Sequence, residues 1–227
     1  MGARHMKDVQ LPLRDRRQAG RVLAERLEHL RGDPNLLVLG VPRGGVAVAF
    51  EVALALQAPL DIFVVRKLGY PGHEEYALGA IASGGVRVMN PAVDVPVSPE
   101  DLAAVVAREQ DELVRRELLY RGSRPAIAIQ GRTVVLVDDG LATGSTMRAA
   151  VLAVRQQKPH RLVVGVPVGA EDTCAMLRRD ADEVICAAMP SPFRAVGLWY
   201  QEFPQASDEE VHQLLDESRR LRALSIH

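Results

Sequence analysis

Short runs of almost uninterrupted apolar residues recur along the chain, and stretches with helical spacing separate most of them. Such runs are typical of buried strands, and the stretches between them are typical of helices. The predicted strands cover residues 36–41, 60–65, 133–137, 162–166 and 183–187, and the predicted helices cover 46–56, 145–157 and 172–179. This alternation predicts an α/β fold, a doubly wound and mostly parallel sheet with helices on both faces.

Helix signals also flank the alternating pattern. Asp15 is a suitable N-cap for a first helix that carries its apolar residues on one face. After a short predicted strand at 86–89, Ser98 marks the start of a helical insertion at about 98–121. A final helix is expected from about Asp208.

These elements suggest how the chain is divided. We expect a core at residues 14–190 that includes the helical insertion. Residues 191–227 contain the densest aromatic cluster and should form a C-terminal hood and helical segment. Together with the inserted segments, they should make a small cap. The polar, glycine-containing stretch 68–79 predicts a mobile loop, because loops of this length are often lids or binding loops. We interpret residues 1–5 as a cloning scar and give them no functional weight.

Composition narrows the class of protein. The chain has 28 basic and 29 acidic side chains, so no global positive field is expected to hold a nucleic acid. No apolar run reaches the roughly 18 residues needed to span a bilayer, and the start lacks the apolar run of a signal peptide, so we expect a cytoplasmic protein. Cys174 and Cys186 show neither the spacing of a disulfide framework nor that of a zinc site, which favours a reducing compartment.

The densest candidate chemistry lies in residues 134–146, Val-Val-Leu-Val-Asp-Asp-Gly-Leu-Ala-Thr-Gly-Ser-Thr. Asp138 and Asp139 follow a predicted strand, where carboxylates can accept hydrogen bonds from vicinal ribose hydroxyls or help place a hydrated divalent cation. Hydroxyl side chains at the predicted helix start can join the backbone N–H groups in holding a phosphate. These hydroxyl residues are Thr143, Ser145 and Thr146.

Other phosphate motifs do not fit these residues. A P-loop requires lysine before the Ser/Thr, but Gly144 leads directly to Ser145. A dinucleotide fingerprint also fails, because Gly40, Gly44 and Gly45 lack the G-x-G-x-x-G spacing. A plain turn capped by aspartate is the remaining structural interpretation, and the combination of acids and hydroxyls makes it the weaker one.

The same segment resembles the phosphoribosyl pyrophosphate motif of type I phosphoribosyltransferases: an apolar strand, two acids and a short Thr-Gly turn. Upstream, Pro-Arg-Gly-Gly at 42–45 resembles the family's pyrophosphate loop. Arg66 and Lys67, followed by 68–79, resemble the flexible loop that closes over the site. The resemblance covers about residues 14–190, and the whole chain is similar to a bacterial group of predicted phosphoribosyltransferases with no generally assigned physiological substrate.

The resemblance implies displacement of pyrophosphate from the ribose C1 by a nucleophile, usually a nucleobase nitrogen. By this resemblance the catalytic residues are Asp138, Asp139, Arg43 and Lys67. The implied substrate-binding residues are Gly44, Gly45, Arg66, Gly140, Leu141, Ala142, Thr143, Gly144, Ser145, Thr146 and Trp199. Packing of Trp199 onto the core is an equally good interpretation. Magnesium is expected mainly through the substrate, with Asp138 or Asp139 as the candidate protein ligands, and a homodimer is expected only by family analogy.

The identity of the acceptor stays open. Purine-salvage members carry an acid in the turn that faces the base, where this chain has Ala142. The turn is closer to that of uracil phosphoribosyltransferases, but Asp139-Gly140 stand where Pro-Met would be expected. A rival hypothesis is a regulatory protein that binds phosphoribosyl pyrophosphate or a nucleotide without turnover, although no helix-turn-helix or basic surface is visible. A phosphohydrolase with Asp138 or Asp139 as nucleophile is the second rival.

Overall fold

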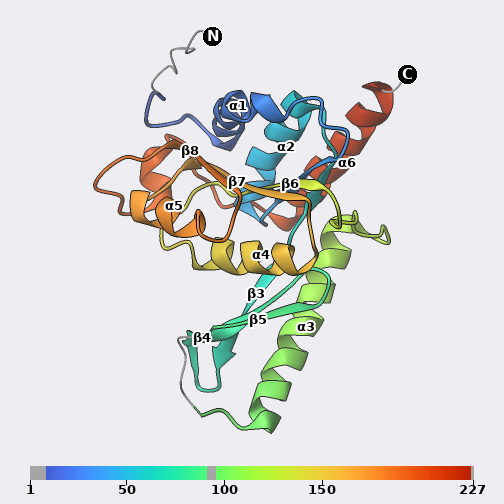
Figure 1. Ribbon diagram of the computed structural model, residues 1–227, viewed down its shortest axis with the longest axis vertical. Helices are drawn as coiled ribbons and strands as arrows, with labels where there is room; N and C mark the ends of the chain where they lie inside the picture. Colours follow the sequence, from blue (N-terminus) through green and yellow to red (C-terminus); the bar gives the residue numbers. More distant parts are fainter. Residues whose placement is uncertain (1–8, 91–95, 226–227) are drawn as a thin grey trace.

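The computed structural model describes residues 9–90 and 96–225, so the proposed cloning scar at 1–5 lies outside the described residues. Within these residues, a central sheet of five strands has every neighbouring pair parallel (Figure 1). In spatial order its strands are β2 (Leu60–Ile62), β1 (Leu36–Gly40), β6 (Thr133–Val137), β7 (Arg161–Val168) and β8 (Glu183–Ala188). The predicted α/β fold with a mostly parallel sheet is therefore confirmed.

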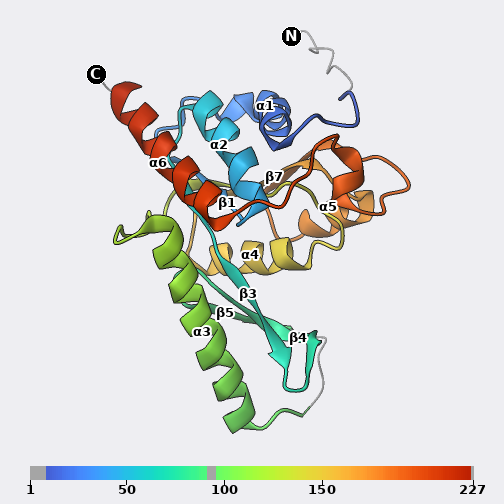
Figure 2. The same cartoon turned by 180° about the vertical axis from the view of Figure 1, so that it is seen from behind.

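Helices cover both faces of this sheet (Figures 1 and 2). One face carries α1 (Arg16–Arg26), α2 (Gly44–Leu56) and α6 (Asp208–Ser225), and the other carries α4 (Ser145–Gln156) and α5 (Glu171–Leu177). Successive strand residues alternate between the two layers, so that Val135 packs toward α2 while Val134 packs toward α4. This alternation explains why β1 is apolar at every position and why β6 is apolar from Val134 to Val137.

Two predicted helix starts have the expected caps. The Asp15 side chain accepts a hydrogen bond from the Gln18 backbone N–H at 2.7 Å, at the start of α1. Ser98 accepts one from the Asp101 N–H at 3.0 Å, at the start of α3 (Pro99–Arg121). In both helices the side-chain oxygen satisfies an N–H group that has no partner within the helix. Two short 3₁₀ segments, η1 (Glu28–Leu30) and η2 (Val196–Trp199), complete the helical elements of the described residues.

The mobile loop predicted at 68–79 was wrong, because these residues lie in a β-hairpin. β3 (Val65–Tyr70), β4 (His73–Ala82) and β5 (Val86–Met89) form an antiparallel sheet below the core (Figure 1). The turn between β3 and β4 contains Gly72, whose φ of 76° lies in the left-handed region that favours glycine. The base of this small sheet packs on α3 with one face and on α4 with the other, whereas Gly72, His73 and Tyr76 near the turn are exposed.

The two cysteines form a disulfide that their spacing did not indicate. The Sγ atoms of Cys174 and Cys186 are bonded at 2.04 Å, which links α5 to β8. The cysteines are 12 positions apart, and their proximity depends on how this helix packs against the strand that follows it. A single bridge between neighbouring elements carries none of the spacing signatures of a disulfide framework.

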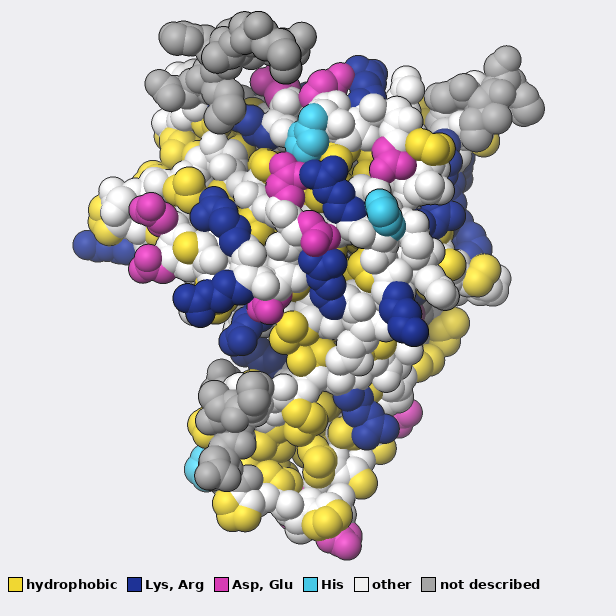
Figure 3. All heavy atoms as spheres, viewed as in Figure 1, with side chains coloured by type: hydrophobic (Ala, Val, Ile, Leu, Met, Phe, Trp, Pro, Cys, Tyr) yellow, Lys and Arg dark blue, Asp and Glu magenta, His cyan; other side chains and the backbone are white. Residues whose placement is uncertain are grey.

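Charges of both signs are mixed over the upper lobe of the face in Figure 3, whereas apolar side chains gather over the hairpin sheet below. Among the described residues, no helix combines the length and the apolar character that a bilayer span requires. The division of the chain into a core at 14–190 and a C-terminal hood at 191–227 stays a prediction.

The connections from β1 and β6 leave the sheet in opposite directions. β1 continues into α2 on one face, and the neighbouring β6 continues into α4 on the other (Figure 1). The two strand ends stay together, since the Val41 N–H donates to the Val137 carbonyl at 2.9 Å. Such a switch point opens a crevice at the carboxyl ends of the strands, where ligands of open α/β sheets bind.

Candidate active site

Two adjacent carboxylates lie at this crevice, directly after β6. Asp138 accepts a hydrogen bond from the Asp139 backbone N–H at 2.8 Å, and the Asp139 side chain is 16% exposed. Burial raises the pKa of Asp138 well above its usual range, and the neighbouring Asp139 carboxylate raises it further. Burial also raises the pKa of Asp139, while Arg16 counteracts the effect. Ionising both carboxylates is therefore unfavourable unless a cation or hydrogen-bond donors bind beside them.

Arg16 is a residue of this site that the sequence analysis missed. Its Nε donates to Asp139 Oδ2 at 2.8 Å, and its Nη1 donates to the Pro204 carbonyl at 2.6 Å. The guanidinium carbon lies 3.9 Å from the centroid of the Phe203 ring. Arg16 therefore joins the start of α1, the C-terminal segment and the carboxylate pair. Because 123 positions separate it from Asp139, no local motif could have identified it.

The turn between β6 and α4 lines a cavity of about 180 Å³. Asp138, residues 140–147 and Val196 form its walls, so the structure brings together the predicted turn residues. The turn is anchored on both sides: the Leu141 N–H donates to the Val168 carbonyl at 3.0 Å, and Thr173 Oγ1 donates to the Ala142 carbonyl at 2.7 Å.

Chemically, this turn is suited to an anion. The hydroxyl residues of the turn are exposed, and they stand at the N-terminus of α4, where the first N–H groups have no partner within the helix. The helix dipole adds partial positive charge at the same place. A phosphate group can bind there while the sugar attached to it faces the two carboxylates. The exposed hydroxyl residues are Thr143, Ser145 and Thr146.

The predicted pyrophosphate loop lies against the carboxylates. A Cβ atom on Gly44 would collide with the carboxylate of Asp139, and one on Gly45 would lie 2.8 Å from the Asp138 Cα. Only glycines allow the two loops to approach this closely. Arg43 lies beside them, with Nη1 at 3.9 Å from Asp208 Oδ1.

We expect Gly45→Ala to destabilise the protein by about 1–3 kcal/mol, because backbone atoms of β6 must move to admit the methyl group. Gly165→Ala is the matched control, since its methyl group would meet only side-chain carbons of Leu23 and Leu27 at 3.4 Å or more. Its effect should stay below about 1 kcal/mol. Urea unfolding of both variants measures the difference, and equal effects would show that the contact with Asp138 is unimportant for stability.

Asp208 itself is held at the start of α6. It accepts a hydrogen bond from the Tyr120 hydroxyl at 2.7 Å. Burial, together with this hydrogen bond, raises the pKa of Tyr120 to about 12, so the hydroxyl stays protonated as a donor. The contact connects the end of α3 to Arg43 through one carboxylate.

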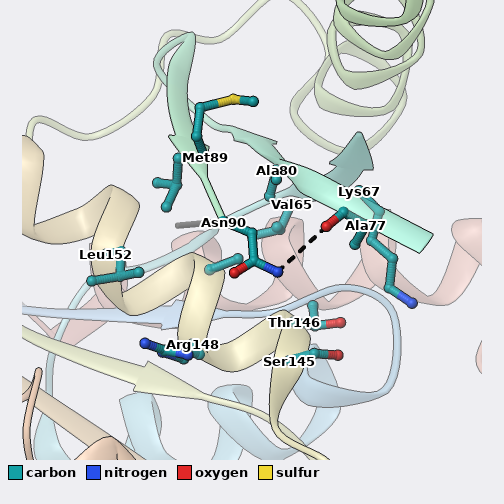
Figure 4. A pocket seen from close by; sticks show the side chains of 13 residues that line it. Val65, Lys67, Ala77, Ala80, Met89, Asn90, Ser145, Thr146, Arg148 and Leu152 are labelled. Atoms are coloured by element: carbon teal, nitrogen blue, oxygen red, sulfur yellow. Dashed lines mark hydrogen bonds between the residues drawn. The ribbon is translucent and has the colours of Figure 1, made fainter. Parts of the chain in front are cut away.

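Arg66 and Lys67 have different positions, although they are adjacent on β3. Arg66 donates to Glu109 Oε2 from both Nε and Nη2, at 2.9 and 2.7 Å, and Glu109 is buried on α3. Lys67 is exposed and lines a second cavity with Ser145 and Thr146 (Figure 4). The structure thus brings Lys67, but not the guanidinium of Arg66, to the turn that starts α4.

Trp199 lies at the end of η2 and is half-buried against the core cluster. Its ring centroid is 6.1 Å from that of Phe193, and its carbonyl accepts a hydrogen bond from the Leu13 N–H at 2.8 Å. Val196, at the start of the same segment, lines the cavity beside the turn, whereas Trp199 does not. Stacking of a base on Trp199 stays a prediction.

The residues present fit a magnesium ion that is held chiefly by its substrate. Within residues 9–90 and 96–225, no group of three or more His, Cys, Asp or Glu side chains could hold a metal by itself. Asp138 and Asp139 offer hard oxygen ligands beside the hydroxyl-rich turn at 143–146. Mg²⁺ typically keeps several waters and binds through one or two carboxylates and substrate phosphates, a demand that this pair can meet.

Comparisons with known proteins agree with this geometry. The family described as phosphoribosyl transferase domain matches residues 14–199. A Mycobacterium tuberculosis protein provisionally named a phosphoribosyl transferase is 49% identical over 209 residues, covering 91% of this chain and 47% of the relative. This chain thus spans about half the length of that relative. The bifunctional protein PyrR of Leifsonia xyli is 34% identical over 134 residues, covering 59% of this chain and 57% of that protein.

Among solved structures, the crystal structure of TT1426 from Thermus thermophilus superposes with a TM-score of 0.80. The identity is 46%, and the alignment covers 90% of this chain and 98% of TT1426. The family match extends from the start of the first helix, across both loops of the crevice, to the end of η2. The chain therefore belongs to the phosphoribosyl transferase domain family.

Proposed function

We propose that this protein transfers the 5-phosphoribosyl group of phosphoribosyl pyrophosphate to a nitrogen of a nucleobase-like acceptor and releases pyrophosphate. One observation carries the proposal: a glycine loop and a carboxylate pair, placed by neighbouring parallel strands, touch each other beside a hydroxyl-rich helix start. The three parts of the donor, its phosphate, its ribose and its diphosphate, match these three features. Membership of the family supports the same donor.

In this proposal the side chains act mainly through charge. The turn at 143–146 binds the 5-phosphate, and Asp138 with Asp139 accepts hydrogen bonds from the ribose hydroxyls. Positive charge develops on the ribose ring as the C1–oxygen bond breaks, and the two carboxylates stabilise it. Arg43 and Lys67 stabilise the negative charge that grows on the departing pyrophosphate. Magnesium, when bound to the diphosphate, would supply further positive charge to the leaving group.

Arg16 is a positioning residue in the same proposal, and a pH profile tests it. Ionised carboxylates are the better acceptors for ribose hydroxyls, so donor binding should strengthen as pH rises through the raised pKa values of the pair. Arg16 lowers the pKa of Asp139. Arg16→Met should therefore shift the midpoint of donor binding to higher pH, and Arg16→Lys should shift it less.

Calorimetric titrations of phosphoribosyl pyrophosphate between pH 5 and 9 measure this midpoint. Arg14→Met is the matched control, because Arg14 is exposed and pairs with Asp15 rather than with the carboxylate pair. A loss of affinity without a shift of the midpoint would mean that Arg16 acts only as a nearby positive charge.

Two features of the site bear on the acceptor. Ala142 leaves the turn without a carboxylate, so a purine that needs such an acceptor group is not favoured. Val196 covers Gly140 so closely that a Cβ atom on this glycine would collide with the valine methyl groups. Together they favour a small acceptor that makes few polar contacts with the turn.

The deciding experiment incubates the protein with phosphoribosyl pyrophosphate, magnesium and a panel of purine and pyrimidine bases, and measures released pyrophosphate. Release that depends on one of the bases supports the proposal. Binding of the donor without release for any acceptor would overturn it in favour of a regulatory protein that binds the donor or a nucleotide. Release of inorganic phosphate instead would indicate a phosphohydrolase.

A further inference from the structure

A second cavity, of about 160 Å³, lies between the hairpin sheet and α4 (Figure 4). Val65, Ala80 and Val88 line it from the sheet, and Ala149 with Leu152 lines it from the helix. Apolar side chains also gather on the surface below the core in Figure 3. The cavity is therefore a product of the hairpin, which the sequence analysis interpreted as a loop.

The two ends of this cavity differ in chemistry. Lys67, Ser145 and Thr146 lie toward one end, and Leu152 lies toward the other (Figure 4). The polar end is at the first turn of α4, where N–H groups and the helix dipole favour negative charge. Arg148 also lines the cavity, although its Nε lies 3.7 Å from Asp180 Oδ2, and the described lining residues include no Asp or Glu. An anionic group is thus favoured at one end and an apolar group at the other.

The size of the cavity limits the apolar group. Engineered cavities of about 150 Å³ with apolar linings bind one benzene molecule. A cavity of about 160 Å³ therefore accepts a single six-membered ring or a branched chain of similar volume.

We infer that this cavity binds a small amphiphilic monoanion, a single apolar ring with a carboxylate, and that this ligand and the sugar-phosphate donor exclude each other. Ser145 and Thr146 line both cavities, whereas Asp138 lines only the first. A carboxylate that takes these hydroxyls and the first N–H groups of α4 occupies the place of the donor's 5-phosphate. The exclusion rests on the proposed function, but the binding site itself does not.

The site is tested with phenylacetate as the probe. Phenylacetamide has the same shape without the charge, and acetate has the charge without the ring. Titrations followed by protein NMR should give the tightest binding for phenylacetate, with both analogues weaker by about tenfold or more. Lys67→Gln should lower the affinity for phenylacetate and leave the affinity for phenylacetamide unchanged.

A second comparison locates the probe. Ala149→Phe fills the cavity from α4 and should reduce phenylacetate affinity by about tenfold or more. Ala104→Phe introduces the same side chain at an exposed position of α3 and should leave the affinity unchanged. Equal binding of phenylacetate and phenylacetamide, or an Ala149→Phe variant that binds like the wild type, would overturn the site.

The exclusion is measured by repeating the phenylacetate titration with saturating phosphoribosyl pyrophosphate. The apparent dissociation constant of the probe should rise in proportion to the donor concentration, and that of the donor should rise in the same way with the probe concentration, because the two ligands exclude each other. If both ligands bind without affecting each other, the shared use of Ser145 and Thr146 is refuted. If the donor does not bind at all, the proposed function fails. The titrations with Ala149→Phe still show whether phenylacetate binds in the cavity.

Discussion

Replacing Asp138 and Asp139 together by asparagine is expected to weaken binding of phosphoribosyl pyrophosphate by about a hundredfold or more. The carboxylates lie beside the glycine loop and the turn at 143–146, and in the proposed complex they accept hydrogen bonds from the ribose hydroxyls. A hydrogen bond to a charged group contributes about 1.5–3 kcal/mol, and losing two of them corresponds to at least that decrease. Calorimetric titration with magnesium present measures the change.

The same variant should keep its fold. Because burial raises the folded-state pKa of Asp138 above its unfolded value, protonation of this group favours folding, and that contribution is lost as pH rises through the folded pKa. At pH 8 the neutral asparagines remove the cost of burying adjacent charges but also leave Arg16 without its carboxylate partner, so the two effects oppose each other and the thermal midpoint should change little. Asp111→Asn, an exposed change on α3, is the control and should bind the donor normally. An unchanged donor affinity in the double variant would refute the assignment of the pair.

The largest effect on stability is expected for Arg121→Ala, at about 3–5 kcal/mol. Arg121, the last residue of α3, is buried, with Nε at 2.7 Å from Asp61 Oδ1 and Nη1 at 2.9 Å from Glu117 Oε1. Its Nη2 also donates to the Ile62 carbonyl at 2.8 Å. Removing the guanidinium leaves the Asp61 carboxylate buried without its positive partner, so the folded state carries an uncompensated charge.

Arg115 offers a matched control on the same helix. Its Nε lies 2.7 Å from Glu112 Oε2, but the arginine side chain is 59% exposed. Exposed ion pairs contribute about 0–1 kcal/mol, so Arg115→Ala should change stability only slightly. Urea unfolding of both variants compares them. Similar losses in the two would show that burial of the Arg121 network does not govern its contribution.

The parts of the fold that follow from local patterns could be predicted from the sequence. Continuous apolar runs identified β1 and β6 because both faces of a parallel strand are buried, and the predicted range of β6 matches its observed bounds. Ser98 identified the start of α3 because capping depends on residues within one turn. The turn that follows β6 was found for the same reason, since its acids and hydroxyls are contiguous.

The remaining parts depend on contacts between distant segments. Arg16 reaches Asp139 only after α1 packs on the sheet, and nothing in its local sequence distinguishes it from Arg17. The hairpin was interpreted as a loop because the stretch 68–79 is polar and contains glycines, and exposed residues such as His73 occupy positions on its strands. The turn dipeptide Pro71-Gly72 between two strands was the available signal for it.

The central claim is that the crevice between β1 and β6 binds phosphoribosyl pyrophosphate. A crystal structure of the complex with the donor and magnesium tests it most directly. We predict that the 5-phosphate lies at residues 143–146, the ribose hydroxyls contact Asp138 and Asp139, and the diphosphate contacts the loop at 42–45. A donor bound elsewhere, or bound with its ribose away from the two carboxylates, would contradict the proposal.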